Sequence, residues 1–301
     1  MMARAHPDAA QQAMLTPGPP EFTSYWRMVW RRFRRHRPAV IGAAVTASLI
    51  VLAVAGPAIT GHRAEVVRLS QVFRPPGAGH LLGTDELGRD VVTRLMLAGR
   101  VSLSVGLVAT SISTSVGTLV GFIAGFYGRW VDIGLTRLIE TFLSIPSLAA
   151  MFVLAKFLGT GLTSIILVLC LFGWMFTARL VRGEVLRIKR LDFVDAAVVI
   201  GASNRRIIIH HLLPNVLPPI IVTLTLAVGQ AILAESTISY FGLGIQPPVA
   251  SWGNMLQNAQ EYLWSAPWLA IYPGVAILIT VLSFNFMGDG LRDALDPSLK
   301  R

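Results

Sequence analysis

The chain has 301 residues, of which 53% are hydrophobic and 14% are charged, and its mean hydropathy is +0.62. This composition excludes an ordinary soluble globule and indicates a protein whose solvent is a lipid bilayer. The formal charge of +10 would point to nucleic acid in a soluble protein, but here the basic residues flank long apolar runs, where they set membrane orientation.

The N-terminal segment has two parts. Residues 1–20 are polar and rich in Ala, Gln and Pro, without the apolar stretch of a cleaved signal peptide, so we predict a disordered tail. In the stretch that follows, Trp26, Trp30 and Phe33 recur at helical spacing against a face of arginines. This pattern fits a helix lying on an anionic membrane surface, and it fits equally a positive-inside anchor for the next span.

Membrane spans dominate the rest of the chain. A helix needs about 20 apolar residues to cross a hydrocarbon core of about 30 Å. Six segments meet this test, at residues 39–60, 101–127, 133–157, 162–182, 216–241 and 268–288. If the N-terminus is inside, the inner side collects most Lys and Arg residues, including the cluster from Arg179 to Arg206. Both termini are therefore predicted to be cytoplasmic.

Two spans carry packing signals. In the second span, Gly117, Gly121 and Gly125 form two overlapping G-x-x-x-G steps, which predict the close approach of a neighbouring helix. In the third span, Arg137 and Glu140 are i, i+3 neighbours that can pair on one helix face.

A cytoplasmic stretch from residue 183 to 215 is too polar to cross lipid and too patterned for a linker, so we expect another protein to dock there. Asp192 is a candidate N-cap, and Asp195 would lie in the first turn of a short helix that starts near Phe193. Ala196 and Ala197 would give that helix a face of small residues that a groove on another protein can approach.

A second helix is predicted to follow. Gly201 allows a left-handed stop to the first helix, and Ser203 or Asn204 can cap the second, which Pro214 helps to terminate. The segment therefore predicts a helix-turn-helix that projects from the membrane.

This segment resembles the "EAA" motif of ABC importer permeases, with an aspartate in place of the glutamate. The matching residues are Asp195, Ala196, Ala197, Gly201, Leu213 and Pro214. In that family the short helix inserts into a groove on the ATPase subunit and couples its closure to the membrane helices. Residues 80–90, 235–248 and 288–293 resemble the C-type permease subunit of dipeptide, oligopeptide and nickel importers, and the likeness covers most of residues 80–297.

The resemblance implies an all-α transmembrane fold: a six-helix ABC importer permease bundle with a cytoplasmic coupling-helix hairpin and both termini cytoplasmic. A tail with a basic amphipathic helix (1–38) would precede the first transmembrane helix and an extracytoplasmic loop (39–97). The core permease domain (98–290), with its coupling segment (183–215), would be followed by a cytoplasmic C-terminal tail (291–301).

The resemblance also implies an assembly. In the bacterial plasma membrane, the chain would join a second, B-type permease subunit, two ATP-binding subunits and an extracytoplasmic substrate-binding protein. It would move di- or oligopeptides by alternating access; nickel or another small solute is the alternative.

The sequence lacks an ATP-binding motif, which indicates that other subunits supply the energy for transport. A phosphate-binding P-loop needs a Gly-Lys pair, and none of the three lysines, Lys156, Lys189 and Lys300, follows a glycine. The histidines fall outside the predicted spans, and no span carries two aspartates, which argues against an intramembrane hydrolase. We therefore expect no enzyme activity and no bound cofactor or metal in this chain, with ATP and Mg²⁺ held by the partner ATPases.

An ion-coupled secondary transporter is the second alternative. Glu235, within the fifth span, has the chemistry to bind a proton or a sodium ion; the other interpretation is that it faces the bundle interior and pairs with a polar neighbour. Ser236, Gln246 and Trp252 are the remaining candidates for the pathway. We expect the outer loop 242–267, which carries Trp252 and no basic residue, to dip toward the pathway mouth.

Overall fold

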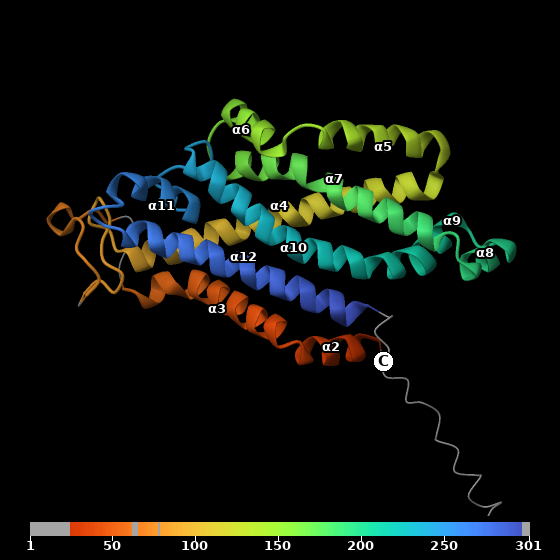
Figure 1. Cartoon of the computed structure of the whole chain (residues 1–301), viewed down its shortest axis with the longest axis horizontal. Helices are drawn as coiled ribbons and strands as arrows, with labels where there is room; N and C mark the ends of the chain where they lie inside the picture. Colours follow the sequence, from red (N-terminus) through yellow and green to blue (C-terminus); the bar gives the residue numbers. More distant parts are fainter. Residues whose placement is uncertain (1–24, 62–65, 78, 297–301) are drawn as a thin grey trace, which may run out of the picture.

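A computed structural model of the chain describes residues 25–61, 66–77 and 79–296. The predicted disordered tail, residues 1–20, lies outside the described residues. Within them the protein is an elongated bundle of helices (Figure 1), and the strand-like pairing consists of two isolated bridges in the loop after α3. The all-α prediction is confirmed.

The helices follow one another along the chain, with short connections between most of them. They are α2 (Tyr25–Arg35), α3 (Arg37–Ile59), the 3-10 turn η2 (Leu69–Gln71), α4 (Val91–Tyr127), α5 (Arg129–Leu143), α6 (Ser147–Leu158), α7 (Leu162–Ile188), α8 (Asp192–Val199), α9 (Asn204–Arg206), the π-helical turn η3 (Ile207–Leu212), α10 (Leu213–Tyr240), α11 (Trp252–Ala259), the 3-10 turn η4 (Gln260–Tyr262) and α12 (Trp268–Leu295).

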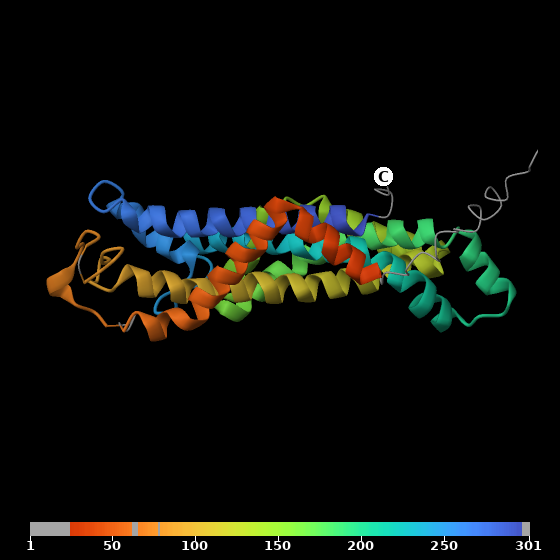
Figure 2. The same cartoon turned by 90° about the horizontal axis from the view of Figure 1, so that it is seen from below.

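Among the described residues, five stretches are long and apolar enough to cross a membrane as single helices: 37–56, 91–127, 162–188, 204–240 and 268–295. The loop after α3 and helix α11 lie at one end of the bundle, and α8 and α9 lie at the opposite end (Figures 1 and 2). Segments far apart in sequence therefore gather at each end.

The third predicted span, 133–157, is not one straight helix. The chain forms α5 and α6, which are bent by 84° relative to each other. Pro146 explains the break, because it has no N–H and disfavours a helical conformation at the preceding residue. The count of six spans is reached when this bent pair is taken as one span. Within α5, Arg137 pairs with Glu140 as predicted, with the two charged groups 3.1 Å apart.

The predicted glycine stripe brings α4 against α7. A Cβ atom on Gly121 would stand 2.5 Å from the carbonyl oxygen of Ala178, and one on Gly125 would stand 2.9 Å from the Val185 side chain. Gly117 meets the backbone of Trp174 in the same way. Because a side chain at these positions would push the backbones apart, the glycines fix how closely the two helices pack.

Pro214 does not end a helix, contrary to the prediction. It lies in the first turn of α10, and helical backbone runs from residue 204 to residue 240. The π-helical turn η3 precedes it, and the N–H of Leu213 bonds to the carbonyl of Ile208, five residues back. This wider turn offsets the carbonyls that a proline ring would meet in a regular α-helix, so the helix continues through the proline.

The ends of the described chain pack together. Val29 and Phe33 of α2 are buried against a small cluster that includes Ala294 and Leu295 at the end of α12. The Nε2 atom of His36, between α2 and α3, lies 3.6 Å from a carboxylate oxygen of Asp293. The segment predicted as the C-terminal tail, 291–301, begins inside α12, whose last residue is Leu295.

Candidate functional site

The hairpin at the end opposite α11 is formed by α8, α9 and η3. Helix α8 begins one residue earlier than predicted, because Leu191, in an extended conformation, is its N-cap and Asp192 is its first residue. No side chain caps this end. Asp192 and Asp195 both lie in the first turn, where their negative charge interacts favourably with the positive end of the helix dipole.

The turn between the two helices of the hairpin has the predicted chemistry. Gly201 has a φ angle of +80°, in the left-handed region. The N–H of Ala202 bonds back to the carbonyl of Ala197 at 3.0 Å, which is the pattern of a Schellman ending. The hydroxyl of Ser203 then accepts a hydrogen bond from the N–H of Arg206 at 3.4 Å and caps the second helix.

The two alanines of α8 point in different directions. Ala196 is exposed, whereas Ala197 is buried and packs inward. Larger apolar side chains are exposed at the end of α8: Val199 is 85% exposed and Ile200 is 84% exposed. That another protein docks on this hairpin stays a prediction.

One apolar cluster joins the hairpin to the bundle. Val194 of α8, Ile207 and Leu212 of η3 and the start of α10 are buried together with residues of α4 and α7. The buried members are Phe122, Phe126, Val181, Val185, Ile188, Val194, Ile207, Leu212, Val216 and Ile220. Leu213 is half-buried against the same cluster, whereas Pro214 is exposed. Val194 of α8 therefore shares one buried core with residues of α4, α7 and α10.

Glu235 is fully buried at the other half of the bundle, where hydroxyl groups surround it. Its carboxylate accepts hydrogen bonds from Ser102 of α4 at 3.0 Å, from Ser239 at 2.8 Å and from Ser236 at 3.3 Å. These partners replace the water that a carboxylate loses on burial. The arrangement agrees with the interpretation in which Glu235 faces the bundle interior and pairs with polar neighbours.

The same hydroxyls hold the loop after α10 and helix α11. Ser102 accepts a hydrogen bond from the backbone N–H of Trp252 at 3.2 Å, and Ser239 accepts one from the N–H of Ile245 at 3.1 Å. Ser251 and Asn254 cap α11 reciprocally. Glu235 is thus the centre of a polar network that joins α4, α10 and α11.

The loop 242–267 enters the fold more deeply than a surface loop. Trp252 is 2% exposed, and its indole N–H donates to the carbonyl of Leu95 at 3.1 Å. Its side chain is therefore enclosed by the chain's own residues, and the approach of this loop to the pathway mouth stays a prediction. Trp264, which is fully exposed, is the tryptophan of this loop that faces outward. Gln246 bonds its own loop, at the carbonyl of Gly242.

A cavity of about 920 Å³ lies between α4, α7, α10 and the corner between α5 and α6. Its wall contains no charged side chain: aromatic and aliphatic groups alternate with hydroxyls and one amide. The polar lining residues are Thr110, Ser113, Thr114, Ser147, Thr177, Thr223, Gln230 and Thr237. None of the predicted pathway residues Glu235, Ser236, Gln246 or Trp252 lines it. The sequence signal that could have identified the cavity lining is the recurrence of Ser and Thr residues inside the apolar spans.

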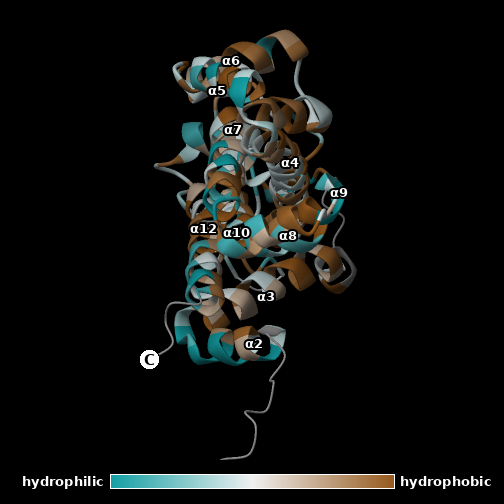
Figure 3. Cartoon of the chain, turned by 90° about the vertical axis from the view of Figure 1, so that its right-hand side faces the viewer, coloured by the Kyte–Doolittle hydropathy of each residue, from teal (hydrophilic) through white to brown (hydrophobic). Residues whose placement is uncertain are grey.

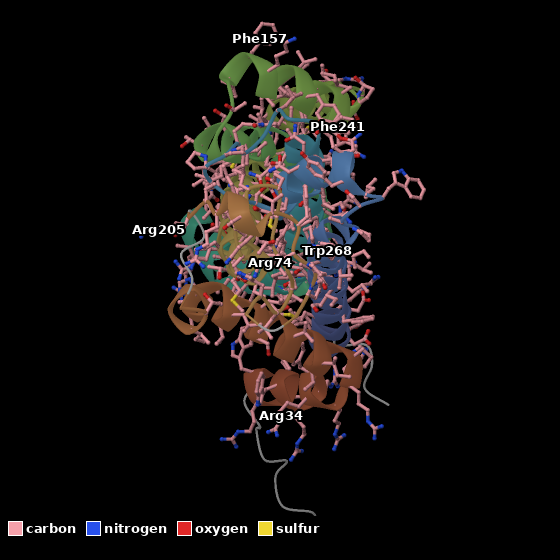
Figure 4. All side chains as sticks on the ribbon, turned by 90° about the vertical axis from the view of Figure 1, so that its left-hand side faces the viewer. Arg34, Arg74, Phe157, Arg205, Phe241 and Trp268 are labelled. Atoms are coloured by element: carbon pink, nitrogen blue, oxygen red, sulfur yellow. The ribbon has the colours of Figure 1, made fainter. Side chains whose placement is uncertain are left out.

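Opposite the hairpin, the loop before α4 is held by buried charges. Asp85 lies 2.7 Å from the Nε of Arg89 and 3.4 Å from a guanidinium nitrogen of Arg94. Asp90 caps α4 by accepting the N–H of Thr93 at 2.9 Å, and its other oxygen lies 2.9 Å from Nδ1 of His80. Figure 4 looks onto this end of the molecule, with Arg74 and Trp268 labelled. Arg89 and Arg94 are thus paired with acidic side chains of the same loop.

Comparisons with known proteins match this chain to transport permeases over most of its length. Residues 117–301 match the family described as binding-protein-dependent transport system inner membrane component, and residues 24–76 match the N-terminal TM domain of oligopeptide transport permease C. A dipeptide transport system permease protein of Bacillus subtilis is 42% identical over 279 residues, which cover 92% of this chain and 87% of that protein. A glutathione transport system permease protein of Escherichia coli is 37% identical over 293 residues, 97% of each chain.

One solved structure shares the fold. The chain of an inward-facing methionine ABC transporter superimposes with a TM-score of 0.56 at 19% sequence identity. The match covers 67% of this chain and 96% of the other.

Proposed function

Because this chain belongs to the family of binding-protein-dependent transport system inner membrane components, a family of transport permeases, we propose that it is one of two permease subunits in an ATP-driven importer of peptides. The proposal rests above all on the hairpin of α8 and η3. An exposed apolar tip at Val199 and Ile200 is joined through a single buried cluster to three long helices. Through a connection of this kind, a displacement of the hairpin by another subunit can move the long helices.

In the proposed cycle, two separate ATPase subunits bind ATP with Mg²⁺ and close on the hairpin. Their closure moves α8, and α4, α7 and α10 move with it because they share its core. The cavity between these helices then changes its accessibility, and the substrate passes from an extracytoplasmic binding protein toward the cytoplasm. The proposed orientation places α8 and both termini in the cytoplasm, as the distribution of Lys and Arg predicts.

Peptides are the proposed cargo because the relatives described above are named as permeases for dipeptides and for glutathione. An uncharged cavity wall suits this class, since it neither attracts nor repels peptides whose side chains differ in charge.

Coupling to an ion gradient has less support. Glu235 already has hydroxyl partners on both carboxylate oxygens, and it does not line the cavity. ATP supplied by separate subunits accounts for transport without a titrating carboxylate in the pathway.

The test is uptake of a labelled dipeptide by vesicles that contain the reconstituted importer, with ATP present and no ion gradient. We expect uptake to depend on ATP and on the ATPase subunits, and the purified chain alone to move no peptide. Uptake that fails with ATP but appears with a proton or sodium gradient would establish a secondary carrier instead. Uptake of nickel but not of peptide would leave the mechanism in place and change the cargo.

A further inference from the structure

Helix α2 (Tyr25–Arg35) has one buried face. Val29 is 6% exposed and Phe33 is 8% exposed, and both pack against Ala39 at the start of α3 and against the end of α12. A guanidinium nitrogen of Arg32 donates a hydrogen bond to the carbonyl of Asp296 at 2.9 Å. The helix is therefore held in a defined position, with its remaining faces turned outward.

The outward faces are strongly basic. Arg27, Arg31, Arg34 and Arg35 are exposed, as is Arg37 just after the helix. Figure 4 shows side chains of α2 fanning away from the bundle, with Arg34 labelled, and Figure 3 shows much of the helix in the hydrophilic colour. No Asp or Glu occurs between residues 22 and 64 of the sequence. The charge is thus uncompensated by the chain's own neighbouring sequence.

The position of α2 along the chain fixes its depth. A single residue, His36, separates it from α3, whose apolar run begins at Ala39. A helix of 11 residues is about 16 Å long, and α2 ends next to the start of the predicted span, so its residues lie within reach of the headgroup region. Trp30, 61% exposed and beside the buried stripe, is the kind of amphipathic side chain that favours this boundary.

We propose that the exposed arginine face of α2 binds the headgroups of anionic lipids in the leaflet where α3 begins. Guanidinium groups match phosphate oxygens in a two-pronged geometry and are easily desolvated beside lipid. The arginines are spread over three turns of the helix, which suits contact with several headgroups. Arginines that bind one acidic side chain would instead point toward a single position. The proposal goes beyond transport of peptides and does not depend on it.

Bound lipid would also affect the helices that α2 touches. The cluster under α2 includes half-buried Ile221 and Val222 of α10, the helix that continues from the hairpin. Lipids that hold α2 at the surface therefore steady the inner ends of α3, α10 and α12 together.

The experiment measures lipid retained by the purified full-length chain, in detergent, during titration with phosphatidylglycerol or phosphatidylcholine, read by native mass spectrometry. The variant Arg27→Gln/Arg31→Gln/Arg34→Gln removes three of the charges. A matched control removes three exposed arginines near the hairpin, with Arg190→Gln/Arg205→Gln/Arg206→Gln. A third variant keeps the charge of α2 by replacing the same three arginines with lysine.

We expect the parent chain to prefer phosphatidylglycerol, with binding that weakens as salt increases. The glutamine variant of α2 should bind it about ten- to a hundredfold more weakly, the change that corresponds to up to about 1 kcal/mol per arginine near an anionic surface. The control and the lysine variant should retain most of the binding. Unchanged unfolding temperatures in zwitterionic detergent would show that α2 remains in place.

Three results would overturn the proposal. The first is equal affinity of the parent and the glutamine variant for phosphatidylglycerol, and the second is an equal loss in the control. The third is a glutamine variant that keeps its lipid but no longer binds the ATPase subunits. That result would assign the arginine face to an acidic protein surface and show that the charge pattern serves assembly.

Discussion

Replacing the tip of the hairpin with charge separates docking from folding. In the double variant Val199→Asp/Ile200→Asp, two side chains that are 85% and 84% exposed become carboxylates. Their environment in the isolated subunit is largely aqueous, and surface changes of this kind usually alter stability by less than about 0.5 kcal/mol each. The variant should therefore fold, insert and unfold at the temperature of the parent chain.

Association with the ATPase subunits should respond very differently. Burying a valine or isoleucine side chain at an interface contributes about 1.5–3 kcal/mol. Loss of both contributions, with two carboxylates to desolvate, weakens association by at least about 3 kcal/mol, or more than a hundredfold in affinity. Peptide uptake in vesicles should fall to the level seen without ATPase subunits.

The assay is co-purification of the ATPase subunits with the tagged chain, quantified across a range of ATPase concentrations. Leu81→Asp is the matched control, because Leu81 is 79% exposed at the opposite end of the bundle. It should leave ATPase binding unchanged. Normal ATPase binding by the tip variant would refute the assignment of α8 as the docking element, and a matching loss in the control would refute its location.

Other consequences of the fold can be measured separately. Gly121→Val should lower the free energy of unfolding in detergent by about 1–3 kcal/mol, because a Cβ at this position meets the backbone of α7. The control Gly134→Val should change it little, because a Cβ there meets nothing within 4 Å. Equal losses in the two variants would contradict the packing argument. Glu235→Leu should cost roughly 3 kcal/mol, since it strands buried hydroxyls, and should expose the loop 241–251 to protease; an unchanged digestion pattern would argue against the network. A photo-crosslinker at Trp264, but not at Trp252, should capture the binding protein or the second permease, and capture from Trp252 alone would show that the loop is turned the other way.

The sequence predicted those features that depend on local chemistry. Long apolar runs identified the spans, the glycine stripe identified the face of α4 that a neighbouring helix approaches, and Gly201 and Ser203 identified the turn of the hairpin. Each signal is carried by residues close together in sequence, with a steric or hydrogen-bonding requirement that few other residues meet.

Features that depend on distant residues were missed. Hydropathy continues across residues 133–157, so the 84° corner at Pro146 left little trace in the span pattern. The inward direction of Ala197 depends on how α8 packs in the folded chain, where it lies against η3. The environment of Glu235 is completed by Ser102, which is 133 residues away. A pattern read along one segment does not contain these partners.

The shared core beneath α8 has a practical consequence. In the proposed transporter, three long helices would meet the ATPase subunits through one small protruding tip, formed by Val199 and Ile200. An antibody fragment or a cyclic peptide seated on that tip would occlude the ATPase and at the same time immobilise all three helices. The tip is therefore a single point from which uptake could be arrested without any inhibitor entering the membrane.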